Sequence, residues 1–356
     1  MQSGILGFPK VGKTTLFNIL TASRQATDKF GASRETNVAV ARVPDPRLVR
    51  LRDLFEPRKY TPATVEYVDV PGFQKGEGAK SLDLARLRDV DVLVHVVRAF
   101  EDEELVHSEG SVNPSRDVDN LELELILADH DLVERRIERL RAAAKRGLRA
   151  EESKEMELLV DRILPALEAE QPLRDLAIPA DDERRLRGFQ LLSAKPLLVV
   201  YNVSEDEIGR VRAMDLGFAP GVRRDAVVVS APLEAEIAAL AEGEQREFLE
   251  DLGLEEPSLD RVIRATYELL GLISFFTVGE DEVRAWTLRR GTSARDAGGA
   301  IHSDIARGFI RAEVVGWEDL LRLGTLAACR NEGLLRLEGK EYEVRDGEVV
   351  HFRFNV

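Results

Sequence analysis

The sequence contains few of the residues that build covalent or redox sites. Its 356 residues include one cysteine, two tryptophans, three methionines and five histidines. The single Cys329 excludes an intramolecular disulfide and a cysteine-rich metal site, and we interpret it as a small core residue. No apolar run approaches the roughly 20 residues that a membrane-spanning helix needs. The sequence therefore predicts neither a disulfide-stabilised nor a membrane-spanning protein.

The sequence also shows neither the pattern of a signal peptide nor an overall basic charge. The first residues, MQSGILGF, show no basic region followed by a long apolar stretch, so we expect no signal peptide and a cytoplasmic protein. The net charge of -15 argues against broad electrostatic binding to nucleic acid, although local basic patches are compatible with it. With 44% hydrophobic and 32% charged residues, the chain is typical of a soluble globular protein of two or three domains.

The first motif lies at the start of the chain, in GILGFPKVGKTTLFNIL. Its glycines and the Lys-Thr pair fit the pattern G-x-x-x-x-G-K-[ST], between a short apolar strand and a segment with helical spacing. In this pattern backbone N–H groups close around phosphate oxygens, the lysine reaches the β- and γ-phosphates, and the threonine binds Mg²⁺. The expected nucleotide-binding residues of the loop, which begins at Gly7, are Pro9, Lys10, Val11, Gly12, Lys13, Thr14 and Thr15.

The segment TVEYVDVPGFQKGEG supplies the acidic partner of this loop. Apolar residues lead to Asp69, and Gly72 completes a D-x-x-G pattern. We expect Asp69 to hold Mg²⁺ through water and the N–H of Gly72 to sense the γ-phosphate. The next segment, DVDVLVHVV, is almost continuously apolar, as a buried parallel strand should be. We interpret His95 within it as a core or strand-end residue.

A third segment, LLVVYNVSEDE, is placed to select the nucleotide base. It predicts a buried strand that ends at Asn202, with Glu205 three residues later. In GTPases of this architecture an aspartate at the position of Glu205 accepts two hydrogen bonds from guanine, and the extra methylene of glutamate would disturb that geometry. An ordinary Asx turn or helix cap is the alternative reading of these residues. The expected base-contacting residues, including two from the following SAPLEAEIA segment, are Asn202, Val203, Glu205, Ser230 and Ala231.

Several segments together resemble the YchF type of the Obg-like ATPase family, within the translation-factor-related P-loop GTPases. They are GFPKVGKTTLFNIL, VPDPRL, DVDVLVHVVRAFED, HSEGSVNPSRD, NVSE, SAPLEAEIA, EVRAWTLRRGTSARDAGGAIHSDIARGFIRAE and RLEGKEYEVRDGEVVHFRFNV. The resemblance covers nearly the whole chain. It implies a P-loop NTPase fold (α/β, a Ras-like domain with a mostly parallel sheet), a preference for ATP attributed to the Asn-x-x-Glu motif, and a C-terminal TGS domain of the ubiquitin-like β-grasp type.

The resemblance also implies which residue orients the attacking water. Ras-like enzymes place a glutamine directly after D-x-x-G, whereas this chain has Phe73 there, as the family has an apolar residue. Gln74 comes one residue too late and is a weaker candidate. The family's candidate is a loop histidine, which corresponds to His107 in ELVHSEGS. A neutral imidazole can orient the water or accept its proton.

The chain departs from the family pattern at two positions. Lys10 stands where the family has an asparagine that, in potassium-activated relatives, helps to hold a monovalent cation near the phosphates. Its ammonium either replaces that cation or points to solvent, and we expect hydrolysis to be insensitive to potassium. The switch I threonine of the family corresponds to Ser33, which is the expected third Mg²⁺ ligand beside Thr14 and Asp69; Thr36 is out of register.

The sequence divides into three regions. We predict a nucleotide-binding domain over residues 1–272, a helical insertion within it over 119–195, and the TGS domain over 273–356. Apolar residues at helical spacing on both sides of a glycine indicate an antiparallel hairpin in the insertion. Its turn, RRIERLRAAAKRGLR, contains seven Lys or Arg and fits either a solvated surface or an RNA-contacting tip.

These observations favour a slow P-loop ATPase that acts as a switch and contacts the ribosome or ribosomal RNA. Mg²⁺ is the expected cofactor, and Lys13, His107 and Gly72 are the expected catalytic residues. No membrane partner and no DNA specificity are expected. Two alternatives remain open: a conventional GTPase of the same fold, and a nucleotide-gated binding module whose hydrolysis is incidental.

Overall fold

The computed structural model describes residues 1–25, 38–70, 84–145 and 147–355. The predicted site residues Ser33 and Gly72, together with Phe73 and Gln74, lie outside these ranges. The chain forms two compact units, the first from residues 1–40 and 66–269 and the second from 41–65 and 270–356. Within the described ranges, no helix has both the length and the apolar character needed to cross a membrane.

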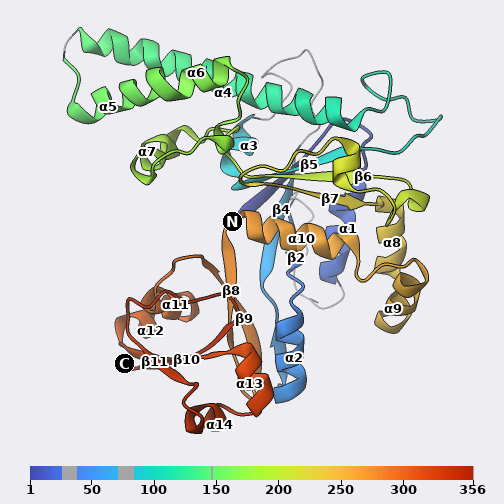
Figure 1. Cartoon of the computed structure of the whole chain (residues 1–356), viewed down its shortest axis with the longest axis vertical. Coiled ribbons are helices and arrows are strands. Elements are labelled where there is room, and N and C mark those ends of the chain that lie inside the picture. Colours follow the sequence, from blue (N-terminus) through green and yellow to red (C-terminus); the bar gives the residue numbers. More distant parts are fainter. Residues whose placement is uncertain (26–37, 71–83, 146, 356) are drawn as a thin grey trace. The chain divides into compact units, whose positions relative to one another are not determined.

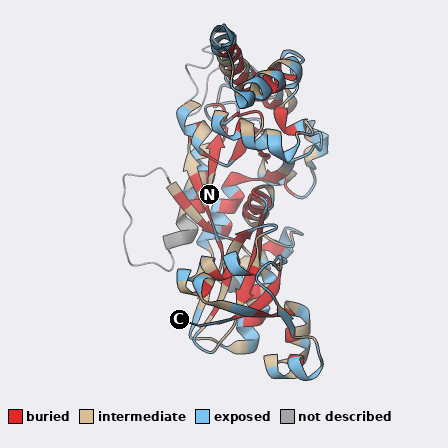
Figure 2. Ribbon diagram, turned by 90° about the vertical axis from the view of Figure 1, so that its left-hand side faces the viewer, coloured by how far each residue is buried: buried red, intermediate tan, exposed pale blue. Residues whose placement is uncertain are grey.

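A six-stranded sheet forms the centre of the first unit (Figure 1). Its strands, in spatial order, are β2 (Val38–Arg42), β4 (Thr64–Asp69), β1 (Gln2–Leu6), β5 (Val92–Arg98), β6 (Leu197–Asn202) and β7 (Arg224–Val229). All pairs from β4 to β7 are parallel. Every residue of β5 and β6 is buried (Figure 2), which agrees with their continuous apolar sequences, because helices cover both faces of a parallel sheet.

Helices pack on both faces of this sheet. Helices α1 (Lys13–Gln25) and α10 (Ser258–Leu269) cover one face, while α3 (Leu84–Asp89) and the start of α4 (Pro114–Ala144) cover the other (Figure 1). The remaining helices of the unit are α5 (Ala150–Leu158), α6 (Leu164–Glu168), α7 (Ala180–Leu186), α8 (Ala231–Ala239) and α9 (Glu242–Asp251). This three-layer arrangement is the P-loop NTPase fold that the sequence predicts.

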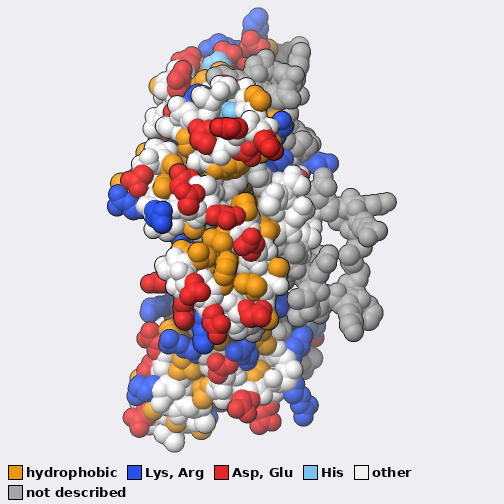
Figure 3. Space-filling model, turned by 90° about the vertical axis from the view of Figure 1, so that its right-hand side faces the viewer, with side chains coloured by type: hydrophobic (Ala, Val, Ile, Leu, Met, Phe, Trp, Pro, Cys, Tyr) orange, Lys and Arg blue, Asp and Glu red, His pale blue; other side chains and the backbone are white. Residues whose placement is uncertain are grey.

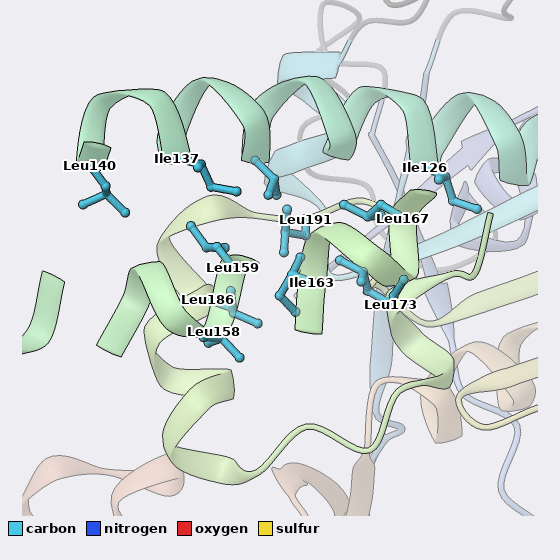
Figure 4. Packing of buried hydrophobic residues seen from close by; sticks show 12 residues of the cluster. Ile126, Ile137, Leu140, Leu158, Leu159, Ile163, Leu167, Leu173, Leu186 and Leu191 are labelled. Carbon is cyan, nitrogen blue, oxygen red and sulfur yellow. The ribbon is translucent and has the colours of Figure 1, made fainter. Parts of the chain in front are cut away.

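The predicted helical insertion is an antiparallel hairpin of α4 against α5 and α6. Ile137 and Leu140 of α4 face Leu159 and Ile163 of the returning helix in one buried cluster (Figure 4). The returning helix contains a π-helical turn, Leu159–Ile163, which ends two residues before Pro165. Because proline has no N–H to donate into the helix, the hydrogen-bond ladder is interrupted there. The hairpin begins at Pro114, with Asn113 as N-cap, a few residues before the predicted start at 119.

The second unit contains a mixed six-stranded sheet. Its strands, in spatial order, are β11 (Arg336–Glu338), β10 (Phe309–Gly316), β12 (Glu348–Phe354), β8 (Leu272–Thr277), β9 (Glu282–Arg289) and β3 (Lys59–Thr61). The hairpin β8–β9 is followed by helices, and the last strand, β12, returns between β10 and β8 and runs parallel to β8. This is the predicted β-grasp arrangement. The helices of the unit are α2 (Pro46–Phe55), α11 (Ala294–Ile301), α12 (Ser303–Arg307), α13 (Trp317–Leu323) and α14 (Leu326–Asn331). Cys329 is free and buried in it, as expected.

Residues 41–65 correct the predicted domain boundaries. The prediction placed them in the nucleotide-binding domain, but they belong to the second unit. Strand β3 adds to the edge of the β-grasp sheet in parallel with β9, with Lys59 opposite Glu282. In α2, Arg47 forms an ion pair with Asp346, at 2.7 Å between Nη1 and Oδ2. These contacts join segments more than 200 residues apart, so no local pattern reports them.

Candidate functional site

The predicted site residues lie at one edge of the parallel sheet. The phosphate-binding loop follows β1, Asp69 ends β4, Arg98 ends β5 and Asn202 ends β6. Ile5 is opposite both Asp69 and Val94, and Arg98 is opposite Asn202, so β1 and β4 end at one level while β5 and β6 extend four residues further in the same direction. The carboxyl edge of an open parallel sheet is where such folds bind their ligands. The strand order therefore brings together three motifs that are far apart in the sequence.

Two glycines of the phosphate-binding loop sit where a side chain would not fit. Gly12 has φ +94°, and a Cβ there would lie 2.3 Å from Nδ2 of Asn202. At Gly7 a Cβ would lie 2.4 Å from the carbonyl oxygen of Val96. The loop can therefore take its path only with glycine at these positions. It delivers the chain directly into α1, whose amino end provides free N–H groups and partial positive charge for an anion.

Lys13 is held beside the acidic residue of the second motif. Its ammonium lies 3.1 Å from Oδ1 of Asp69 and donates a hydrogen bond to the carbonyl of Val70. The side chains of Lys13 and Asp69 keep 12% and 24% of their exposure, so both remain reachable by a ligand. The structure thus places the predicted phosphate-binding cation and the predicted Mg²⁺-binding carboxylate in direct contact.

Asn202 connects two loops of the site. Its side chain is buried, with Nδ2 donating to the carbonyl of Val11 at 3.0 Å and Oδ1 accepting from the N–H of Ala231 at 2.9 Å. The phosphate-binding loop and the start of α8 are therefore held at a fixed separation by one amide. Since one N–H and the carbonyl oxygen are already used, Asn202 acts first as a structural link of the site.

The other predicted base-contacting residues divide into a buried and an exposed group. Val203, Ser230 and Ala231 are buried, and Val203 donates its N–H to the carbonyl of Val229 at 2.8 Å. Glu205 is exposed and has no hydrogen-bond partner among the described residues. The turn that carries it is fixed by its neighbours instead, because Ser204 donates its hydroxyl to Glu207 at 2.5 Å. This is the helix cap that was the alternative reading of the segment, and it leaves Glu205 available to a ligand.

Two titratable side chains inside the sheet add no charge to the site. Burial lowers the pKa of His95 to about 3, and the positive charge of Arg224 acts in the same direction. Burial also raises the pKa of Tyr201 to about 12. Both are therefore neutral at physiological pH, which confirms His95 as a core residue. Among the predicted site residues, the formal charges are those of Lys10, Lys13, Asp69 and Glu205.

The residues expected to bind Mg²⁺ have the chemistry that the ion requires. Thr14 lies exposed in the first turn of α1, and the buried Oδ1 of Asp69 has its ion pair with Lys13 but accepts no hydrogen bond from the described residues. Among these residues, no group of three or more His, Cys, Asp or Glu side chains is placed to hold a metal ion. Mg²⁺ in nucleotide sites takes one or two protein oxygens and completes its shell with water and phosphate, so this donor set fits.

The loop after β5, which carries His107, is fixed by a buried arginine that the sequence analysis did not single out. Arg98 is 1% exposed and donates to three backbone carbonyls, those of Phe100 (3.0 Å), Leu105 (2.8 Å) and Asp102 (3.3 Å). Its guanidinium also lies 4.7 Å from the ring centroid of Phe100. A charged residue at the end of the apolar run VLVHVVR is the signal that could have identified it, because a buried charge needs partners.

Both ring nitrogens of His107 have a close polar neighbour, Nδ1 through a hydrogen bond and Nε2 through an ion-pair contact that lacks hydrogen-bond geometry. Nε2 lies 3.0 Å from Oδ2 of Asp117, and Nδ1 accepts the N–H of Glu109 at 3.1 Å. Asp117 is 1% exposed, and its other oxygen accepts two hydrogen bonds from Arg116. In this arrangement the imidazole has no free lone pair for water. A role in orienting water therefore requires His107 to leave Asp117.

The fold, the glycine-dependent loop and the Lys13–Asp69 pair define a P-loop nucleotide-binding protein. Two family models match the chain: one described as "50S ribosome-binding GTPase" covers residues 2–132, and YchF-GTPase_C, described as "Protein of unknown function", covers residues 272–355. The chain is similar over its whole length to the protein named ribosome-binding ATPase YchF of Bacillus subtilis (43% identical, 100% of both chains). It is also similar to the protein of that name in Escherichia coli O157:H7 (40% identical, 100% of this chain and 99% of the relative).

A solved structure agrees with this result. The structure of the YchF GTPase of Schizosaccharomyces pombe is 31% identical, with a TM-score of 0.89 over 99% of this chain and 97% of that one. A GTP-binding protein of Pyrococcus horikoshii, 19% identical with a TM-score of 0.57, shares the fold over 100% of both chains. The chain belongs to the YchF family.

Proposed function

We propose that the chain is a nucleoside triphosphate hydrolase that prefers ATP, releases ADP and phosphate, and acts as a nucleotide-dependent switch on the ribosome. The contact of Lys13 with Asp69 at the amino end of α1 carries the proposal, because it gathers phosphate-binding and Mg²⁺-binding groups at one point. The bacterial relatives are named ribosome-binding ATPases, which supports both the reaction and the partner. We propose a cytoplasmic location for the same reason.

Binding of the nucleotide requires Lys13 to change partners. Its ammonium leaves Asp69 and Val70 and moves to the β- and γ-phosphates, while N–H groups of residues 10–15 surround the phosphate oxygens. Asp69, released from Lys13, and the hydroxyl of Thr14 would hold Mg²⁺, with Ser33 as the third proposed ligand. Bound Mg²⁺ would neutralise charge that develops on the phosphates. Phosphoryl transfer to water needs this positioning and neutralisation more than covalent chemistry.

Ribosome sedimentation tests the switch directly. We expect the protein to pellet with ribosomes in the presence of a non-hydrolysable ATP analogue and to be released with ADP. Equal sedimentation in both nucleotides, together with ATP turnover at the background rate, would instead support a passive binding module. A GTPase is the second candidate, because one matching family model and the related protein of Schizosaccharomyces pombe carry that activity in their names. Hydrolysis assays with ATP and GTP side by side separate the two.

The Asp117 contact leads to a prediction about His107. If His107 orients the attacking water, we expect Asp117→Asn to raise kcat by about threefold to tenfold, because a neutral amide holds the imidazole less firmly than a carboxylate does. The gain should disappear in the double variant with His107→Ala. Asp129→Asn is the matched control, since Asp129 is also a buried carboxylate of α4 but binds the N–H groups of Leu192 and Ser193. A lower kcat in Asp117→Asn with an unchanged Tm would contradict this role.

Lys10 leads to a prediction about monovalent cations. It is exposed and adopts φ +64°, a left-handed backbone conformation that asparagine adopts at a lower energetic cost than lysine does. If its ammonium replaces a bound cation, ATP turnover should differ by less than about twofold between KCl and NaCl of equal ionic strength. Lys10→Asn should then gain stimulation by potassium. Strong stimulation of the unmodified protein by potassium over sodium would show that Lys10 does not play this part.

A further inference from the structure

The turn of the helical hairpin carries a local excess of positive charge. Residues 139–150, RLRAAAKRGLRA, contain five Lys or Arg and no Asp or Glu. The first unit that surrounds them is acidic, with 32 Lys or Arg against 48 Asp or Glu and a net charge of -16. Asp and Glu side chains are spread over the face of the molecule shown in Figure 3. The net charge of the turn is therefore positive, whereas that of the unit to which it belongs is negative.

The basic side chains of the hairpin fall into a paired and an unpaired group. Along the body of the hairpin and its neighbouring helix, each of the following has a carboxylate partner: Arg135 with Asp131, Arg136 with Glu155, Lys154 with Glu151, Arg162 with Asp182, and Arg185 with Asp182. At the turn, Arg139, Arg141, Lys145 and Arg149 are exposed, and no ion pair joins them to any described residue. We call these four residues the basic tip.

Helix capping explains only part of this pattern. The last turn of α4 contains Arg141, and a cation there interacts favourably with the carboxyl end of the helix. Arg149, however, is the residue before α5, at a helix amino end where a positive charge is unfavourable. Between these positions, residues 142–144 are exposed alanines, whose short side chains project little from the helix. An anionic partner would offset the cost of Arg149.

The basic tip is held firmly and far from the nucleotide site. The buried cluster of Figure 4 fixes α4 against the returning helix, and Arg136 adds two hydrogen bonds to Glu155, at 2.6 and 2.9 Å. The 31 residues of α4 span about 45 Å at 1.5 Å per residue. Asp117, which binds His107, lies at one end of this helix, and the basic tip lies at the other. Substitutions at the tip should therefore leave nucleotide chemistry unchanged.

We propose that the basic tip binds the phosphate backbone of RNA. Arginine and lysine without carboxylate partners are the side chains that contact phosphate oxygens, and their number sets the salt dependence of binding. This inference rests on the proposed function, because the ribosome would supply the RNA. It assigns that contact to one surface of the hairpin.

Two triple variants of equal charge test the proposal. The tip variant is Arg139→Gln, Arg141→Gln and Lys145→Gln, and the control variant is Arg135→Gln, Arg136→Gln and Arg162→Gln, from the paired group. Glutamine preserves helix propensity in both. The affinities of the wild type and of both variants are measured across a salt series, for bacterial ribosomes and for protein-free large-subunit ribosomal RNA. ATP turnover and Tm are measured on the same samples.

We expect the tip variant to lose at least about tenfold in affinity for both probes and to show a log–log salt slope that is less steep by about 2–3. The control variant should stay within about threefold of the wild type, and ATP turnover should be equal in all three proteins. Equal losses of affinity in the two variants would overturn the proposal and show that the basic tip is an ordinary solvated surface. Loss of ribosome binding with no affinity of the wild type for RNA would also overturn it, in favour of an acidic protein partner. Binding of RNA through the tip without ribosome binding would refute the proposed partner while the inference stands.

Discussion

Replacing Lys13 by alanine is expected to lower kcat/KM for ATP by at least about a hundredfold to a thousandfold. The Lys13 side chain lies at the amino end of α1, and its ammonium is 3.1 Å from Asp69, the candidate ligand of Mg²⁺. Without it, the charge on the β- and γ-phosphates has no fixed ammonium partner during transfer. Most of the loss should appear in kcat, because this contact strengthens as the phosphoryl group leaves. Steady-state phosphate release at saturating Mg²⁺ and ATP measures it.

Lys59→Ala is the matched control for this experiment. Lys59 also forms an ion pair with a carboxylate, at 3.0 Å from Glu282, but it lies on β3 of the second unit. Its removal should change kcat/KM by less than about twofold, since an exposed pair contributes little. If Lys13→Ala hydrolysed ATP as fast as Lys59→Ala, the phosphate-binding loop would not be the reaction site.

Replacing Asn202 by alanine is expected to damage both stability and nucleotide binding. The substitution removes the amide that joins the carbonyl of Val11 to the N–H of Ala231, and both of these groups are left buried. Each unpaired group costs about 1–3 kcal/mol, so the free energy of unfolding should fall by about 2–6 kcal/mol. ATP affinity should fall by at least about tenfold, because the phosphate-binding loop is no longer tied to α8. Urea unfolding and binding of a fluorescent ATP analogue measure the two effects.

Ser293→Ala separates the two effects of Asn202→Ala. Ser293 caps α11 in the second unit by accepting the N–H of Asp296, so its loss should cost about 1 kcal/mol. Nucleotide affinity should not change. If Asn202→Ala lost stability but kept the wild-type affinity for ATP, Asn202 would be a structural residue with no influence on the site.

The parts of the site that could be predicted from the sequence are those whose residues are close together in the chain. The phosphate-binding loop is local: its two glycines, lysine and threonine lie within eight positions between a strand and a helix. The continuous burial of β5 and β6 follows from their apolar runs. The hairpin follows from apolar positions at helical spacing in α4 and its partner. The base-reading strand could be placed because Asn202 ends an apolar run.

The parts that escaped prediction depend on contacts that only the fold creates. Residues 41–65 join the second unit through β3 and Arg47, which meet partners in the C-terminal sheet. Asp117 lies before the predicted start of the helical insertion at 119 and was not singled out, yet its Oδ2 lies 3.0 Å from Nε2 of His107, ten positions earlier. Arg98 was given no role, because the predicted strand stopped at Val97, although its three backbone acceptors shape the loop that carries His107. Hydrogen bonds to backbone carbonyls have no side-chain signature in a sequence.

The choice of base is the central claim, and equilibrium binding of fluorescent ATP and GTP analogues with Mg²⁺ tests it most directly. Glu205 is exposed and without a partner among the described residues, on a turn fixed by Ser204 and Glu207. We predict that the wild type binds the adenine nucleotide more tightly and that Glu205→Asp shifts the affinity toward guanine, while the neighbouring Asp206→Glu does not. A wild-type preference for GTP of more than about tenfold, roughly 1.4 kcal/mol, would contradict the account and make the protein a GTPase with an unusual base-reading loop.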